Sequence, residues 1–145
     1  MLELKTDCIL LDLRATSKEA VLRELAEAAQ PQCVPISAEE LTGVLMQREE
    51  VGSTGMGNGV ALPHGKLPGL QRITICFGRS INGIHFDAVD NRPVQLFVMI
   101  LSPSGTTTEY LKSLAHVSNL LKHQENRNFL LSTDDKEKII HFFER

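Results

Sequence analysis

The chain has 145 residues, of which 42% are hydrophobic and 23% are charged, and its formal net charge is -3. This length suits one domain that can bury a core, and no apolar run approaches the roughly 20 residues that span a bilayer. A negative net charge without a basic cluster argues against nucleic acid as the main ligand. We therefore expect one soluble domain, residues 1–145, with no direct membrane insertion.

The N-terminus and the cysteines indicate a cytoplasmic protein. The segment after Met1, "LELKTD", has neither the basic start nor the apolar stretch of a secretion signal. Cys8, Cys33 and Cys76 are odd in number and widely separated, without the spacing of a metal site. We expect them to be reduced thiols in the core, and we expect no metal.

Two helices are predicted before residue 52. Thr16 and Ser37 each stand three positions before a glutamate, Glu19 and Glu40, which is the pattern of a reciprocal helix cap. An apolar stripe at helical spacing follows each pair and predicts the buried face. The stripes consist of Val21, Leu22, Leu25, Ala28 and Ala29 in the first helix, and of Leu41, Val44 and Leu45 in the second.

The middle of the chain predicts a sheet. Short strands are expected near Gly52–Thr54 and Gly59–Leu62, and Ile73–Phe77 alternates with a period of two. Residues 94–101, "VQLFVMIL", are almost all apolar, which indicates a central strand buried on both faces. Such a strand belongs to a sheet covered by helices on both sides, so the predicted fold class is α/β.

The C-terminal third predicts helices again. Thr106 and Glu109 repeat the capping pattern, and Asp134 and Asp135 open a shorter helix at the end of the chain. Residues 125–131 are a candidate for a further helix. The expected inward-facing residues are Tyr110, Leu111, Leu114, Val117 and Leu121 in the first of these helices, and Ile139, Ile140 and Phe143 in the last.

The segment 51–69, "VGSTGMGNGVALPHGKLPG", combines many glycines with two prolines and one histidine. A phosphate-binding P-loop would need a glycine at Val60 and a hydroxyl at Leu67. The run Gly55–Gly59 is one residue short of the dinucleotide-binding fingerprint. The segment therefore predicts a shaped loop that binds no nucleotide, and we expect no cofactor.

What this loop presents is a single histidine, His64. Proline stiffens the approach to the ring and Gly65 removes side-chain bulk after it. A neutral imidazole nitrogen can attack phosphorus, and hydroxyls and a guanidinium nearby can bind the phosphoryl oxygens. Arg48, Ser53 and Thr54 lie just upstream. The alternative is a surface connector that carries a histidine by chance.

The stretch "QREEVGSTGMGNGVALPHGK", residues 47–66, resembles the signature of the fructose/mannitol-type IIA family of the bacterial phosphoenolpyruvate:sugar phosphotransferase system (PTS), and in particular its stand-alone nitrogen-regulatory branch. The similarity continues through "FDAVDNRPVQLFVMILSP" and "EYLKSLAHVSNLL", so it covers nearly the whole chain. The resemblance implies a mixed β-sheet flanked by helices in one domain. It also implies that an HPr-like phosphocarrier phosphorylates a histidine.

By this resemblance, His64 is the phosphoacceptor and Arg48 contacts the phosphoryl oxygens. Supporting or phosphate-binding positions are Ser53, Thr54, Gly65 and Tyr110. Tyr110 departs from the family, because many members carry a second histidine at this position. His116 lies about 120° further round the same helix, so it is not expected to replace that histidine. Glu49–Glu50 is expected to be a solvated helix end, and ordinary surface or boundary positions are expected for His85, His123 and His141.

The leading hypothesis is a phosphotransferase that works through a phosphohistidine and has a regulatory, nitrogen-related output. The alternative within this class is a IIA subunit that passes the phosphoryl group to a IIB component for fructose- or mannitol-type uptake. A chain of 145 residues has no room for a IIB or a membrane IIC domain. An alternative of another class is a binding module that controls regulatory targets without phosphoryl transfer. The retained His64 and Arg48 argue against it.

Overall fold

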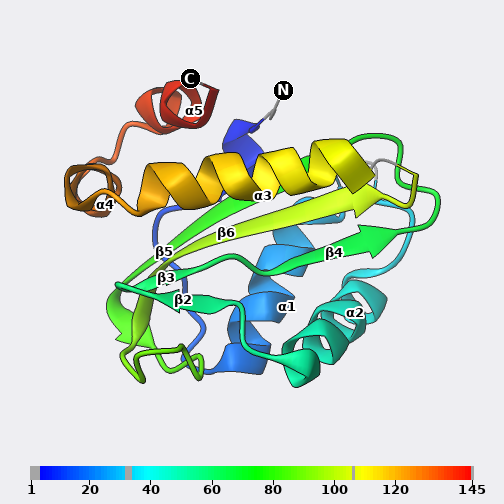
Figure 1. The fold of residues 1–145 in the computed structure, drawn as a ribbon, viewed down its shortest axis with the longest axis horizontal. Helices are drawn as coiled ribbons and strands as arrows, with labels where there is room; N and C mark the ends of the chain where they lie inside the picture. Colours follow the sequence, from blue (N-terminus) through cyan, green and yellow to red (C-terminus); the bar gives the residue numbers. More distant parts are fainter. Residues whose placement is uncertain (1–3, 32–33, 106, 145) are drawn as a thin grey trace.

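A mixed sheet of six strands forms the centre of the part of the chain that the computed structural model describes, residues 4–31, 34–105 and 107–144 (Figure 1). The order is β1-β5-β6-β3-β2, and β4 also pairs with β6. β5 runs antiparallel to β6, whereas β3 and β4 follow each other along the other edge of β6, both parallel to it. The strands are β1 (Ile9–Leu10), β2 (Gly55–Gly57), β3 (Val60–Ala61), β4 (His64–Leu67), β5 (Thr74–Ile84) and β6 (Val94–Pro103).

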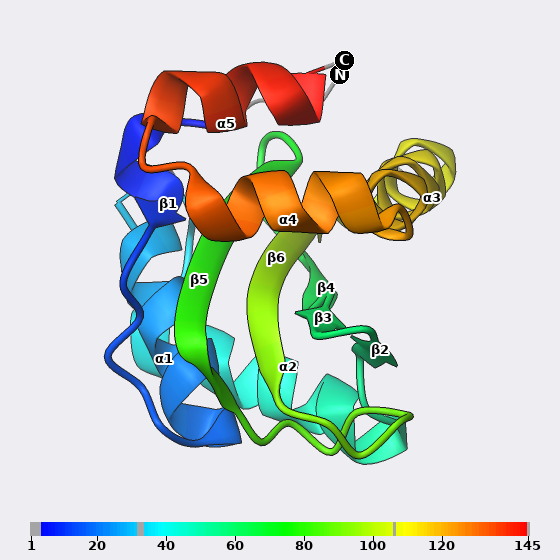
Figure 2. The same cartoon turned by 90° about the vertical axis from the view of Figure 1, so that its left-hand side faces the viewer.

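Helices cover both faces of this sheet. Figure 2 shows β5 and β6 between α1 on one side and α3 on the other, while α2 packs against α1 and β4. This arrangement confirms the α/β fold class with flanking helices. The helices are α1 (Lys18–Ala29), α2 (Ala38–Val51), α3 (Thr107–Leu121), α4 (Gln124–Ser132) and α5 (Lys136–Glu144), and a short 3-10 helix, η1 (Thr6–Cys8), precedes β1.

The capping predictions have mixed outcomes. Ser37 caps α2 as expected, since its Oγ accepts a hydrogen bond of 3.1 Å from the amide of Glu40. The prediction for α1 was wrong by one residue, because Ser17 is the cap and its Oγ accepts from Ala20 N at 3.2 Å. Thr16 and Ser17 are both candidates for the cap position. The carboxylate of Glu19 does not reach back to Thr16, as a reciprocal cap would require, but lies 3.8 Å from the guanidinium of Arg23. The predicted cap Thr106 lies outside the described residues.

The predicted core is largely confirmed, with one error in α3. Leu111 is 58% exposed, because it lies one position, or about 100°, beyond the buried Tyr110. The face that α3 buries instead follows the spacing of Tyr110, Val117 and Leu121. In α5, Ile139 and Phe143 are buried as predicted, and the buried Phe142 was missed.

The C-terminal helices otherwise match the expectation. α4 spans the residues that were a candidate for a further helix. Asp135 opens α5, because its Oδ1 accepts hydrogen bonds from the amides of Glu137 and Lys138 at 3.0 and 3.3 Å. Asp134 instead binds the guanidinium of Arg79 at 2.8 Å.

The strand predictions are confirmed at the centre and for β3, which lies within the expected Gly59–Leu62, but they fail for the other short strands. Val94 and residues 96–102 of β6 are buried, so β6 is the expected central strand. β5 extends well past Phe77, with an irregular register between Arg79 and Ile84. The strand expected at Gly52–Thr54 is wrong, because Gly52 ends α2 and β2 begins only at Gly55. The short β1 and the histidine-bearing β4 were missed.

Two smaller expectations concern the cysteines and the membrane. Cys8 and Cys76 are buried free thiols, as expected, and Cys33 lies outside the described residues. In the described parts of the chain, none of the helices has the length and apolar character needed to cross a bilayer.

Candidate functional site

The glycine-rich segment folds as a tight hairpin, β2–β3, followed by β4. Gly57 and Gly59 adopt φ of 93° and 78°, a left-handed conformation that suits glycine and turns the chain back on itself. At Gly55 the constraint is space, because a Cβ would lie 2.8 Å from Ala88. The glycines therefore fix the path of the chain that leads to His64.

His64 is the first residue of β4, paired with Ile100 of β6. Pro63 separates β3 from β4, although its carbonyl still accepts a hydrogen bond from Ile100 N at 2.9 Å. The Nδ1 atom of His64 lies 2.7 Å from the carbonyl oxygen of Leu62. A carbonyl can only accept, so we assign the proton to Nδ1 and the lone pair to Nε2.

The half-buried setting of His64 keeps the ring neutral. Burial has the largest effect and lowers the pKa of His64 below its ordinary value of 6.5, and the positive charge of Arg48 also lowers it. The hydrogen bond to Leu62 O and the negative charge of Glu49 raise the pKa by smaller amounts. Because the net direction is downward, the neutral form predominates at pH 7. A neutral ring with its lone pair on Nε2 is a competent nucleophile.

Arg48 lies in the last turn of α2 and lines the same open hollow as His64. Its Nη1 donates a hydrogen bond of 2.8 Å to the carbonyl of Gly52, which caps the end of the helix. A guanidinium has five N–H donors in a planar fork. The side chain is therefore tied to the loop through one donor while it faces the region around His64.

Ser53 and Thr54 line this hollow too, but their hydroxyls are engaged within the protein. Ser53 Oγ donates to Phe86 O at 2.8 Å and accepts from Gly55 N at 3.0 Å. Thr54 Oγ1 donates to the Glu49 carboxylate, which also accepts the amide of Thr54 at 3.0 Å. Both residues hold the base of the hairpin, and their role toward a phosphoryl group stays a prediction.

Gly65 follows His64 within β4. A Cβ at this position would lie 3.6 Å from Val44, an ordinary contact, so the protein itself has room for a side chain there. The supporting role of Gly65 also stays a prediction.

The expectation of a solvated helix end at Glu49 was wrong. The side chain of Glu49 is 3% exposed and its Oε1 lies 3.0 Å from Lys18 Nζ. Leu41, Leu45 and Glu49 are spaced by four residues, so they share the buried face of α2. This spacing was a signal in the sequence that could have placed Glu49 inside. Glu50 is exposed, as expected.

Tyr110 of α3 lies beside His64. The ring centroids are 5.9 Å apart, with planes at 60°. Burial raises the pKa of Tyr110 to about 12, although the charge of Arg48 lowers it slightly, so the phenol stays neutral at physiological pH. Lys66 Nζ lies 5.7 Å from the centre of the tyrosine ring and donates to Thr107 Oγ1 at 2.7 Å.

The other histidines lie elsewhere. His116 Nε2 is 3.4 Å from the carbonyl oxygen of Phe143 in α5, and His85 pairs with Asp87 at 2.9 Å. His123 and His141 are exposed. The placements of His85, His123 and His141 confirm that these three are surface residues, as the sequence indicated, whereas His116 is half-buried.

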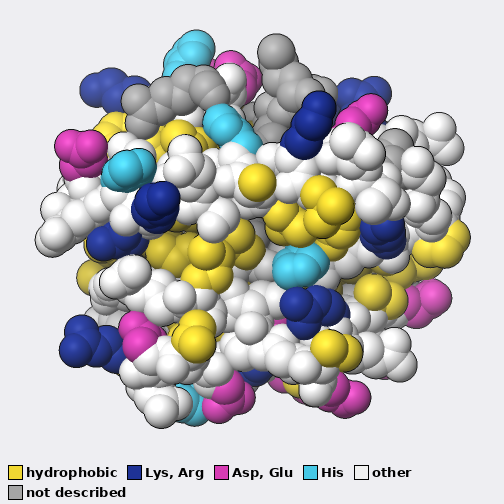
Figure 3. Space-filling view, in the orientation of Figure 1, with side chains coloured by type: hydrophobic (Ala, Val, Ile, Leu, Met, Phe, Trp, Pro, Cys, Tyr) yellow, Lys and Arg dark blue, Asp and Glu magenta, His cyan; other side chains and the backbone are white. Residues whose placement is uncertain are grey.

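The hollow that contains His64 and Arg48, which we call the His64 hollow, has a volume of about 460 Å³. Figure 3 shows a histidine and a basic side chain together in the middle of this face, with hydrophobic side chains around them. The sequence did not point to the apolar rim, in which Val89 is 79% exposed. The rim residues that line the hollow are Met56, Val89, Leu114 and Ala115.

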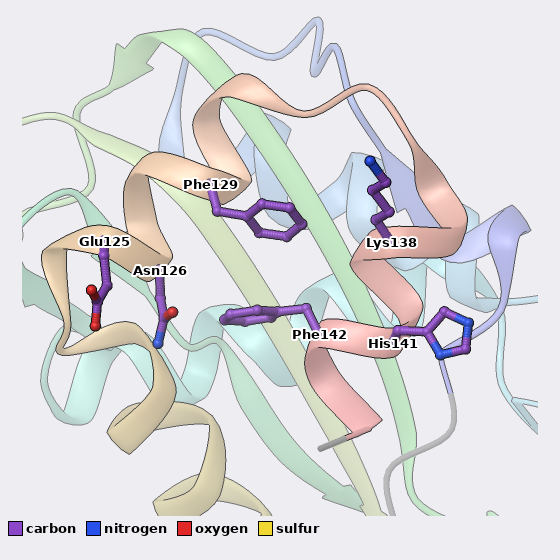
Figure 4. Close-up of a pocket in the computed structure, with 6 residues that line it drawn as sticks. All are labelled: Glu125, Asn126, Phe129, Lys138, His141 and Phe142. Atoms are coloured by element: carbon purple, nitrogen blue, oxygen red, sulfur yellow. The ribbon is translucent and has the colours of Figure 1, made fainter.

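A second hollow of about 580 Å³ lies between α4 and α5 (Figure 4). The rings of Phe129 and Phe142 lie between Glu125 and Asn126 at one end and Lys138 and His141 at the other. None of the residues predicted for phosphoryl transfer lines it. The candidate site is therefore the His64 hollow.

Comparison with known proteins identifies the family. The profile described as "Phosphoenolpyruvate-dependent sugar phosphotransferase system, EIIA 2" matches residues 3–145. A "Nitrogen regulatory protein" from Bradyrhizobium diazoefficiens is 38% identical over 141 residues, which cover 92% of this chain and 86% of that protein. The chain belongs to the EIIA type 2 family of the PTS. It is thus a PTS EIIA phosphocarrier, as the resemblance in the sequence implied.

Two further relatives show the breadth of this EIIA family. A "PTS system fructose-specific EIIA component" from Haloferax volcanii is 31% identical over 133 residues, covering 92% of this chain and 86% of that protein. The crystal structure of nitrogen regulatory protein IIA-Ntr from Neisseria meningitidis superposes with a TM-score of 0.91 at 30% identity, covering 97% of this chain and 95% of that one. Regulatory and sugar-specific EIIA proteins are therefore both similar to this chain.

Proposed function

We propose that this EIIA protein accepts a phosphoryl group on Nε2 of His64 from an HPr-like phosphocarrier. The observation that carries the proposal is the hydrogen bond from Nδ1 to Leu62 O, which leaves the lone pair on Nε2 of a ring that lines the same hollow as Arg48. In the transfer, this lone pair forms the new N–P bond while the N–P bond to the donor's histidine breaks. The donor's nitrogen retains that electron pair. The His64 ring becomes cationic, and the Leu62 carbonyl stabilises the Nδ1 proton.

Arg48 and Tyr110 have different roles in this proposal. The guanidinium of Arg48 binds the phosphoryl oxygens, because its planar fork can donate two hydrogen bonds to one phosphoryl group. Tyr110 packs against the His64 ring and orients it. The phenol supplies no charge that responds to pH near neutrality, because burial raises its pKa. Ser53, Thr54 and Gly65 shape the loop that positions the imidazole ring of His64.

The proposed output is regulatory and nitrogen-related, in the cytoplasm. Similarity to the nitrogen regulatory proteins of Bradyrhizobium and Neisseria supports this output. The second candidate is transfer to a IIB component for sugar uptake, which the similarity to the Haloferax fructose-specific component favours. A binding module without phosphoryl transfer would have no need for a neutral His64 next to Arg48.

Intact-mass spectrometry tests the acceptor. The protein is incubated with phosphoenolpyruvate, enzyme I and an HPr-like carrier, and one acid-labile phosphoryl group is expected. His64→Ala should abolish the mass shift, while the control His116→Ala should retain it. A phosphorylated His64→Ala protein would overturn the assignment. Adding a fructose-type IIB protein then separates the two outputs, because rapid loss of the phosphoryl group to IIB is expected only for a transport component.

A further inference from the structure

A continuous series of contacts connects helix α1 with the imidazole of His64. Lys18 Nζ and the amide of Thr54 both bind Glu49 Oε1, each at 3.0 Å. The carbonyl of Thr54 accepts the amide of Leu62 at 3.1 Å. The carbonyl of Leu62, in turn, accepts Nδ1 of His64 at 2.7 Å. The series therefore ends on the atom that determines which ring nitrogen is nucleophilic.

The Glu49 carboxylate is the fixed point of this series. Both of its oxygens are engaged, since Oε1 binds Lys18 and the amide of Thr54 while Oε2 accepts the Thr54 hydroxyl. Lys18 is itself held in place, because its Nζ lies 4.8 Å from the centre of the Phe86 ring and 3.8 Å from Asp87. A charge buried in this way must be paired, and breaking one partner is costly.

We propose that Glu49 is a positioning residue for phosphoryl acceptance, acting through Thr54 and Leu62 to hold His64 with its proton on Nδ1. This inference rests on the proposed role of His64 as acceptor. Glu49 is buried, so a docked donor protein cannot touch its carboxylate. Its contribution is to fix the backbone of Thr54, whose carbonyl accepts the amide of Leu62, so that the carbonyl of Leu62 points at the ring.

The charged and titratable groups around this series come from several elements. Lys18 of α1 and Asp87, in the segment after β5, lie on the Glu49 side. Arg48 of α2 and Tyr110 of α3 lie on the His64 side. Removing the negative charge of Glu49 should lower the pKa of His64 further, because that charge raises it in the intact protein.

The test uses the unphosphorylated, ¹⁵N-labelled protein and its Glu49→Gln variant. Long-range ¹H–¹⁵N correlation spectra report which imidazole nitrogen carries the proton. In the wild type we expect the proton of neutral His64 on Nδ1, and in Glu49→Gln a substantial population with the proton on Nε2. The rate of phosphoryl acceptance at saturating donor should fall by about tenfold to hundredfold, since small misplacements of a reacting group have effects of this size. The donor concentration for half-maximal rate should change by less than about twofold.

Glu24→Gln is the matched control. Its carboxylate also holds backbone amides, those of Arg14 and Ala15 at 3.0 and 2.9 Å, but Glu24 does not line the His64 hollow. This variant should keep the tautomer and the rate. Thr54→Val is a second test variant, because it retains the amide that binds Glu49 but loses the hydroxyl. An intermediate shift in tautomer is expected, and this measurement stands even where Glu49→Gln does not fold.

The outcomes separate this proposal from the proposed function. A wild-type tautomer and rate in folded Glu49→Gln would overturn the positioning role, as would an unchanged tautomer in Thr54→Val when Glu49→Gln is unfolded. Failure of the wild-type protein to accept a phosphoryl group would instead overturn the role of His64. The tautomer measurement needs no donor, so its result does not depend on that failure.

Discussion

Replacing Arg48 by lysine tests how the phosphoryl group is bound. The substitution keeps the positive charge beside His64 but removes the planar fork that can donate two parallel hydrogen bonds. A hydrogen bond to a charged group contributes about 1.5–3 kcal/mol, so losing one during transfer should slow it by roughly ten- to a hundredfold. Single-turnover transfer from a fixed phosphorylated donor measures this rate. An unchanged rate would show that Arg48 only caps α2.

Arg127→Lys is the control for the structural part of this effect. Arg127 also caps the end of a helix, since its Nη1 donates to the carbonyls of Leu121 and Lys122 at 3.0 and 2.8 Å. It does not line the His64 hollow. Arg127→Lys should therefore lower stability in a similar way and leave the transfer rate unchanged. A matching loss of rate in both variants would contradict the proposed contact between Arg48 and the phosphoryl group.

Three further experiments vary the pH, Tyr110 and Arg79. Acceptance from a fixed donor should stay constant from about pH 8 down to about 6.5 and fall only on further acidification, because the pKa of His64 is lowered from its ordinary value and the lone pair stays available above it. A rate that rises on acidification would contradict this. Tyr110→Phe should slow transfer by less than about tenfold, because it removes one hydrogen bond that the phenol could donate to the phosphoryl group. Tyr110→His should add a second titration near neutrality, and identical pH profiles for the wild type and these two variants would remove Tyr110 from the site. Arg79→Met should lower the free energy of unfolding, measured with urea, by about 3 kcal/mol, because the buried guanidinium binds the carbonyls of Leu11, Leu130 and Thr133. A loss below about 1 kcal/mol would show that water replaces these hydrogen bonds.

Local sequence patterns predicted the elements that bury many apolar residues. The apolar run of β6 required burial on both faces, and the stripe of α1 required one buried side, so both elements were found. β1 and β4 were missed because two to four residues give no clear period, and their pairing depends on distant partners. Neighbouring hydroxyls at Thr16 and Ser17 could not be ranked, since the choice depends on where Glu19 points in the fold.

In the candidate site, too, local features could be predicted from the sequence and features that depend on distant segments could not. His64 and Arg48 could be proposed as site residues because glycines, a proline and the surrounding motif are local features. The apolar rim could not be found in this way, because Met56, Val89 and Leu114 come from three separate segments that only the fold brings together. Glu49 was misplaced because its charge suggested solvent, although its spacing from Leu41 and Leu45 indicated the buried face.

The placement of His64 reconciles two opposing needs of a phosphocarrier. A buried imidazole stays neutral and nucleophilic, but a buried phosphoryl group would carry an uncompensated charge. The half-buried ring meets both requirements, since Nδ1 is bonded to the Leu62 carbonyl while the residue lines an open hollow together with Arg48. The exposed apolar side chains of Val89 and Met56 next to that hollow can exclude water when another protein covers them, which would favour transfer over hydrolysis. Replacing Val89 by aspartate should therefore weaken acceptance through docking of the donor, leaving the tautomer of His64 unchanged.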